Sequence, residues 1–160
     1  MESWNVDADE LIEIASENNR RINSKQILTL DEYSDFNGFG RDIRPYELDD
    51  NGNVRFIVST LNRDAAVYLL DRTIFKNLAK EWDSDLLIGA FMYDKLIIVP
   101  YSDENYEIFC RLGVTMREDM RRDKRYLSDH PYVFKKGEGF LGMKDDDPLG
   151  DKKEEGFPFP

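Results

Sequence analysis

The sequence predicts an α+β fold, with a mostly antiparallel sheet built from hairpins and helices packed on one face. Segments with helical periodicity alternate with short strand-like segments, and turn-forming residues separate neighbouring strand candidates. The two most apolar runs, 86–92 and 96–99, are apolar on both faces. Such runs are typical of central strands covered on both sides, or covered by helices on one side and a partner on the other. We expect the order α-β-β-β-β-α-β-β-α, followed by one small hairpin.

The first predicted helix covers residues 7–22, where apolar side chains recur at helical spacing. Asp7 and Glu10 are spaced as in a capping box, and acids near a helix N-terminus are stabilising. A short apolar piece, 26–30, follows. Residues 31–44 are rich in Asp, Gly and Asn, so we expect a loop there.

Three further strands are expected before the second helix. Segments 43–48 and 54–61 flank residues 49–53, which contain an Asn-Gly pair. Asn-Gly readily takes the positive φ angles of a tight hairpin turn, so the two segments are predicted to pair. Polar residues 62–64 then turn the chain into a strand at 65–70.

The second half of the chain alternates helices and hairpins. Asp71 is expected to cap a helix, and residues 93–95 to form the turn between the two apolar strands, the second ending at Pro100. Asp103 begins a longer helix. A last hairpin is predicted around residues 137–139, from segments 133–136 and 140–143. Its end marks the boundary between a single domain, 1–143, and an acidic C-terminal tail containing Pro and Gly, 144–160.

The expected core follows from these periodicities. It consists of apolar side chains on the inward faces of the predicted strands and helices: Phe56, Val58, Ile74, Leu78, Trp82, Leu87, Ile88, Phe91, Ile97, Val99, Phe109 and Met116.

Composition limits the class of protein. The chain has 160 residues, a formal net charge of −11 and 41% hydrophobic residues, which suits one acidic globular domain and not a disordered polymer. No apolar run approaches the roughly 18 residues of a membrane span, and the acidic start lacks the layout of a signal peptide. A single cysteine, Cys110, agrees with a reducing compartment. We therefore expect a cytoplasmic location and no contact with membranes.

Three motifs that suggest phosphate or metal binding are better explained as turns. Residues 137–142 match G-x-G-x-x-G, but three carboxylates and Pro148 follow where a phosphate cradle needs a helix. Two acidic loops, counted from Glu47 and from Asp145, lack required calcium ligands. We expect no metal and no cofactor.

No catalytic constellation stands out. The only thiol, Cys110, falls on the apolar stripe of its helix, where a free cysteine usually packs as a small hydrophobe. The only histidine, His130, follows Ser128 and Asp129 directly, and this spacing does not by itself give a catalytic triad. We assign no catalytic residue, and we expect that the protein is not an enzyme.

Basic residues concentrate in one place, residues 111–125. Arg111, Arg121, Arg122 and Arg125 cluster on a helical face away from the apolar stripe. One interpretation is a solvated face near a helix C-terminus, and the other is a contact for an anion or an acidic partner. The second interpretation supports an alternative function, a small enzyme or ligand-binding domain that uses carboxylates and these arginines on an anionic small molecule. Direct nucleic-acid binding is not expected, because the rest of the chain would repel a polyanion.

The acidity itself supports the leading hypothesis. High acidity usually serves solubility, whereas a concentrated acidic face can bind a basic protein surface or imitate nucleic-acid phosphates. The acids of this chain are spread over the first helix, the turns and the tail, and the contact face expected on the first helix is Asp7, Glu10, Glu13 and Glu17. We therefore expect a non-enzymatic acidic protein-binding module of the accessory, immunity or inhibitor type, whose partner has a basic surface. A structural subunit of a larger assembly is a third possibility, and the oligomeric state is left open. The Phe-Pro pairs of the tail suggest either packing on the domain or a docking peptide.

Residues 54–136 resemble the C-terminal part of the YtpQ-like family of uncharacterised bacterial proteins. The resemblance is carried by segment 65–78, by segment 85–99 with its central Tyr93-Asp94-Lys95 turn, and by 127–134, Leu-Ser-Asp-His-Pro-Tyr-Val-Phe. It implies an α+β domain and no assigned activity.

Overall fold

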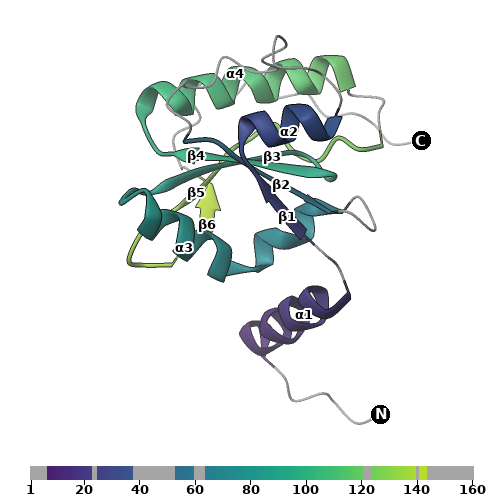
Figure 1. Ribbon diagram of the computed structural model, residues 1–160, viewed down its shortest axis with the longest axis vertical. Helices are drawn as coiled ribbons and strands as arrows, with labels where there is room; N and C mark the ends of the chain where they lie inside the picture. The colour runs from purple at the N-terminus through teal and green to yellow at the C-terminus, as the bar shows by residue number, and fades with distance from the viewer. Residues whose placement is uncertain are drawn as a thin grey trace, which may run out of the picture.

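A six-stranded, entirely antiparallel sheet lies between two layers of helices in the computed structural model (Figure 1). The structure describes residues 7–22, 25–37, 53–59, 64–120, 124–139 and 141–143. The strand order is β1-β2-β4-β3-β5-β6. The elements are α1 (Ala8–Ile22), β1 (Lys25–Leu28), α2 (Leu30–Asn37), β2 (Arg55–Ser59), the 3₁₀ helix η1 (Ala65–Leu70), α3 (Arg72–Glu81), β3 (Leu86–Met92), β4 (Lys95–Pro100), α4 (Asp103–Met120), β5 (Tyr132–Phe134) and β6 (Leu141–Met143). The α+β class and the antiparallel sheet are confirmed.

Two crossover connections build the centre of the sheet. Strands β2 and β3 both pair antiparallel with β4, so they are parallel to each other and are joined across β4 by η1 and α3. Strands β4 and β5 are related in the same way through β3 and α4. Among the described strands, β3–β4 and β5–β6 are joined by short turns, whereas β1 and β2 pair across a connection that contains α2, so the described sheet combines hairpins with longer connections.

Helices cover both faces of the sheet, which corrects the prediction that they pack on one face. Both crossovers carry the chain in the same direction across the strand order, but they start from β2 and β4, which run in opposite directions. Two crossovers of the same hand that start from oppositely directed strands lie on opposite faces of the sheet. Figure 1 shows α2 and α4 on one side and α3 on the other. The continuously apolar β3 and β4 need this two-sided cover.

Each face has its own core cluster. The first contains Phe56, Leu87 and Val99 from the strands and Phe109 from α4. The second contains the alternate strand residues, such as Ile88 and Ile98, with Phe75 and other residues of α3. Of the twelve core residues expected from the sequence, ten are buried, while Trp82 and Met116 are partly buried against these clusters.

Helix α2 replaces the beginning of the loop expected at 31–44. The Glu32 carboxylate accepts hydrogen bonds from the Thr29 backbone N–H at 2.8 Å and from its hydroxyl at 3.0 Å, and the Glu32 N–H donates to Thr29 Oγ1 at 3.3 Å. This is a capping box, and the Thr29 amide holds the pKa of Glu32 below its usual value. The helix places the Tyr33 ring flat on Phe56, with ring centroids 4.0 Å apart. The Thr-x-x-Glu spacing was present in the sequence and was missed.

Residues 65–70 form η1 and not the predicted strand. Both edges of β2 are already occupied, by β1 and β4, so a following strand has no edge of β2 to pair with. The Ala66 N–H donates instead to the carbonyl of Tyr93 at 2.9 Å, and Tyr68 is fully buried in the second cluster. Burial therefore outweighs the strand propensity of this segment.

The remaining described elements agree with the prediction. Asp7 caps α1, Asp71 caps α3, and residues 93–94 turn β3 into β4. The last hairpin turns at Gly137 and Gly139, whose φ angles of 91° and 64° favour glycine. The predicted strand at 43–48 and the tail at 144–160 lie outside the described residues.

Candidate functional site

Helix α1 holds the predicted acidic face and lies at the periphery of the molecule, beside η1 (Figure 1). The Ser16 side chain is buried and its hydroxyl donates to the carbonyl of Leu70 at 3.0 Å. This contact fixes which side of α1 faces the protein. Asp7 acts as the cap, its carboxylate accepting from the Glu10 N–H at 2.8 Å.

The outer side of α1 combines acidic and apolar side chains. Leu11 and Ile14, two of the apolar residues whose spacing predicted this helix, are 50% and 46% exposed. Glu10 and Glu17 lie one turn before and after Ile14, so they flank it on the helix surface, and both are exposed. Glu13 is exposed one turn before Glu17. Three of the acids predicted as contacts therefore lie beside two exposed apolar side chains on one side of the helix. We call this side the α1 surface, and it consists of Glu10, Leu11, Glu13, Ile14 and Glu17.

The predicted arginine cluster is described in part. Arg111 is exposed on α4, Arg125 lies 3.9 Å from the Asp94 carboxylate, and Arg121 and Arg122 fall outside the described residues. A neighbouring arginine, Arg117, pairs with Asp129 at 2.8 Å. The anion-contact hypothesis for this cluster stays a prediction.

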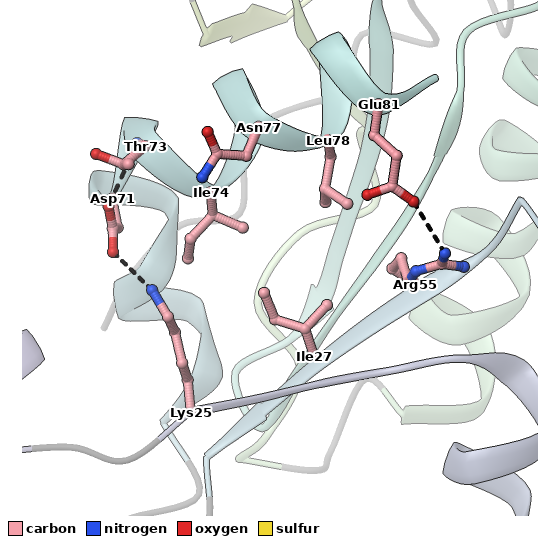
Figure 2. A pocket seen from close by; sticks show the side chains of 9 residues that line it. All are labelled: Lys25, Ile27, Arg55, Asp71, Thr73, Ile74, Asn77, Leu78 and Glu81. Atoms are coloured by element: carbon pink, nitrogen blue, oxygen red, sulfur yellow. Dashed lines mark hydrogen bonds and ion pairs between the residues drawn. The ribbon is translucent and has the colours of Figure 1, made fainter.

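A cavity of about 410 Å³ opens on the other face of the sheet, between β1, β2 and α3. Strand alternation directs Lys25, Ile27 and Arg55 to the face that α3 covers. One side of α3 completes the wall at helical spacing. Figure 2 shows the resulting order along the cavity, with an ion pair at each end and Ile27, Ile74, Asn77 and Leu78 between them. The helix contributes Thr73, Ile74, Asn77, Leu78 and Glu81, and Asp71 lies at its cap.

The carboxylates at the two ends of the cavity differ in burial. At one end Lys25 Nζ lies 2.8 Å from Asp71 Oδ2, and the Asp71 side chain is 3% exposed. Asp71 Oδ1 also accepts from the Thr73 N–H, so this carboxylate is held by both a charge and a helix N-terminus. At the other end Arg55 lies 3.2 Å from Glu81, whose side chain is 54% exposed. No local pattern predicts this cavity, because its walls come from three separate segments of the chain.

The nucleophile and histidine candidates take structural positions. Cys110 is buried in the first core cluster, as the packing interpretation predicted. The Ser128 hydroxyl engages the backbone of His130, accepting from its N–H at 3.1 Å, while the imidazole Nε2 lies 3.2 Å from Asp129. Among the residues that the structure describes, no three His, Cys, Asp or Glu side chains are grouped to hold a metal ion.

Comparisons with known proteins add no relative. No protein-family model, curated protein or solved structure matches the chain significantly. In the described part of the chain, no helix combines the length and apolar character needed to cross a membrane.

Proposed function

We propose that this chain is a non-enzymatic protein-binding module of the accessory, immunity or inhibitor type, which docks on a partner through the α1 surface. The observation that carries the proposal is the exposure of Leu11 and Ile14 beside three acids on a peripheral helix. An amphipathic helix binds by laying its apolar side chains into a groove. The acids beside them favour a groove with basic walls.

The charge of the chain argues against a second copy as the occupant. Pairing two α1 surfaces would bring Glu10, Glu13 and Glu17 of both copies together, on chains that each carry −11. Like charges brought together at an interface oppose association, whereas lysines and arginines on a partner would pair with these carboxylates. The partner class is therefore a protein with an apolar groove and a basic rim.

The first test is capture of a partner from lysate of the native host at low and moderate salt. We compare the wild type with Leu11→Ser/Ile14→Ser, which removes the apolar half of the α1 surface. Leu127→Ser is the matched control, because Leu127 is 48% exposed and lies outside α1. Thermal unfolding of all three proteins verifies that they are folded.

The proposal predicts a stoichiometric partner that moderate salt weakens, that Leu127→Ser retains and that the double variant loses. Salt weakens such a complex because it screens the attraction between exposed charges. A partner held equally by the double variant would contradict docking through α1. Empty lanes at both salt concentrations would also count against a protein-binding function in that host.

A further inference from the structure

The cavity between β1, β2 and α3 has a charge arrangement that selects one class of small molecule. We propose that it binds a free α-amino acid with an aliphatic side chain of about the size of leucine. Its volume, about 410 Å³, lies in the range of small-molecule sites. Three features favour such a ligand (Figure 2): an accessible end where the Glu81 carboxylate is exposed, a mostly apolar middle, and a closed end where the Asp71 carboxylate is buried.

The accessible end recognises the zwitterionic head of the ligand. Arg55 is held in place there, because it donates to the carbonyl of Val54 at 3.0 Å and its guanidinium lies 5.5 Å from the Trp82 ring centre. Its partner Glu81 is half exposed and can turn outward at little cost. The ligand carboxylate takes the place of Glu81 on Arg55, and the ligand ammonium pairs with Glu81.

The middle of the cavity fits an aliphatic tail. Ile27 is 42% exposed, and in Figure 2 it points toward Ile74 and Leu78 of the facing helix. A branched aliphatic chain inserted here covers Ile27 and gains the free energy of apolar burial. A ligand in this cavity would therefore cover Ile27, an apolar side chain that the fold leaves partly exposed.

The closed end, where Asp71 is buried, disfavours an anionic group in that part of the cavity. Asp71 is almost fully buried, and Lys25 is its ionic partner. An anion that drew Lys25 away would separate this ammonium group from a carboxylate that is buried, which is unfavourable. A carboxylate tail would compete with Asp71 for Lys25, so glutamate is a poorer ligand than leucine.

Isothermal titration with L-leucine up to about 10 mM tests the proposal, and backbone NMR shifts locate the site. Three comparison ligands each lack one feature: leucinamide lacks the carboxylate, 4-methylpentanoate lacks the ammonium group, and alanine lacks the tail. We expect saturable binding of leucine and at least about tenfold weaker binding of each comparison ligand. The absence of saturable leucine binding, or equal binding of leucinamide, would overturn the proposal.

Two variants assign the contacts. Arg55→Gln should weaken leucine binding about tenfold or more, because it removes a charged hydrogen-bond donor. Ile27→Ser should weaken it about fivefold without unfolding the protein, because Ile27 is already partly exposed to solvent. Leu127→Ser serves again as the control and should bind like the wild type. Unchanged binding in both Arg55→Gln and Ile27→Ser would place any leucine site elsewhere and would refute the assignment. None of these residues lies in α1, so this outcome is independent of partner docking.

Discussion

Gly113→Ala tests the packing that fixes residues 124–131 against α4. Gly113 lies in the interior of α4, and a Cβ atom added there would lie 2.0 Å from the backbone carbonyl oxygen of Asp129. Ordinary contact begins near 3.4 Å, so the backbone at Asp129 would have to move by about 1.4 Å. Glycine therefore permits the close approach of this segment to the helix.

Two effects of opposite sign decide the outcome. Helix propensity alone would make alanine more stable than glycine by about 1 kcal/mol. Overpacking against a fixed backbone costs about 1–3 kcal/mol, and more when the neighbour cannot move. The segment is fixed, because Leu127 N–H donates to Phe91 and Tyr93 N–H to Arg125, at 2.8 and 2.9 Å. The steric cost should therefore exceed the gain, with a net loss of about 1–3 kcal/mol.

Urea unfolding followed by circular dichroism measures this difference. Glu107→Ala is the control, since Glu107 is exposed on the same helix and its replacement should change the free energy of unfolding by less than about 0.5 kcal/mol. We expect Gly113→Ala to unfold at a clearly lower urea concentration than both the control and the wild type. A Gly113→Ala protein as stable as the wild type, or more stable, would refute the account of this contact.

Two further predictions concern polar contacts that hold single elements. Burial raises the pKa of Asp85, but hydrogen bonds from Lys135 Nζ and the Lys136 N–H, both 2.8 Å, outweigh it and leave this pKa below its ordinary value of 3.8. The contribution of Asp85 to stability is therefore complete above about pH 4 and is lost as the pH falls through the lower native pKa. Asp85→Asn should lower the free energy of unfolding by about 1 kcal/mol at pH 7 and should reduce the loss of stability at acidic pH in a series of urea-unfolding curves. An unchanged loss of stability at acidic pH would contradict this. Thr29→Ala removes the cap of α2 and should lower the free energy of unfolding by about 1 kcal/mol. The backbone amides of α2 should exchange hydrogen faster in this variant than in the control variant Asp35→Ala, and equal exchange in the two variants would argue against the cap.

Local signals predicted much of the fold. Asp71 and the stripe of Ile74, Phe75 and Leu78 predicted α3, and the two apolar runs predicted the central hairpin. These features depend on residues near one another in the chain, which is why periodicity and capping were sufficient. The capping box at Thr29 is the same kind of signal, and α2 was missed because the Asp- and Asn-rich composition was given more weight.

Long-range pairing could not be predicted in the same way. The assignment of 65–70 as a strand was wrong because the edges of β2 are taken by β1 and by β4, strands distant in the sequence. Placement of helices on both faces follows from crossover geometry. The two-sided apolar runs agreed with this placement, but they agreed equally with helices on one face and a partner on the other. The acidic side of α1 was expected from the sequence, but the exposure of Leu11 depends on which side of the helix meets η1. The cavity brings Arg55 beside Glu81 only through the packing of α3 on the sheet.

The most direct test of the proposed docking is a comparison of two charge-reversed proteins with equal net charge. Glu10→Lys/Glu13→Lys/Glu17→Lys reverses the acids of the α1 surface, and Glu104→Lys/Glu107→Lys/Glu118→Lys reverses three exposed acids of α4. The affinity of each for the captured partner is measured by titration calorimetry at low and moderate salt. The account predicts that the α1 variant binds at least about tenfold more weakly at low salt, whereas the α4 variant stays within about threefold of the wild type. Equal losses in the two variants would show that net charge, and not the α1 surface, attracts the partner.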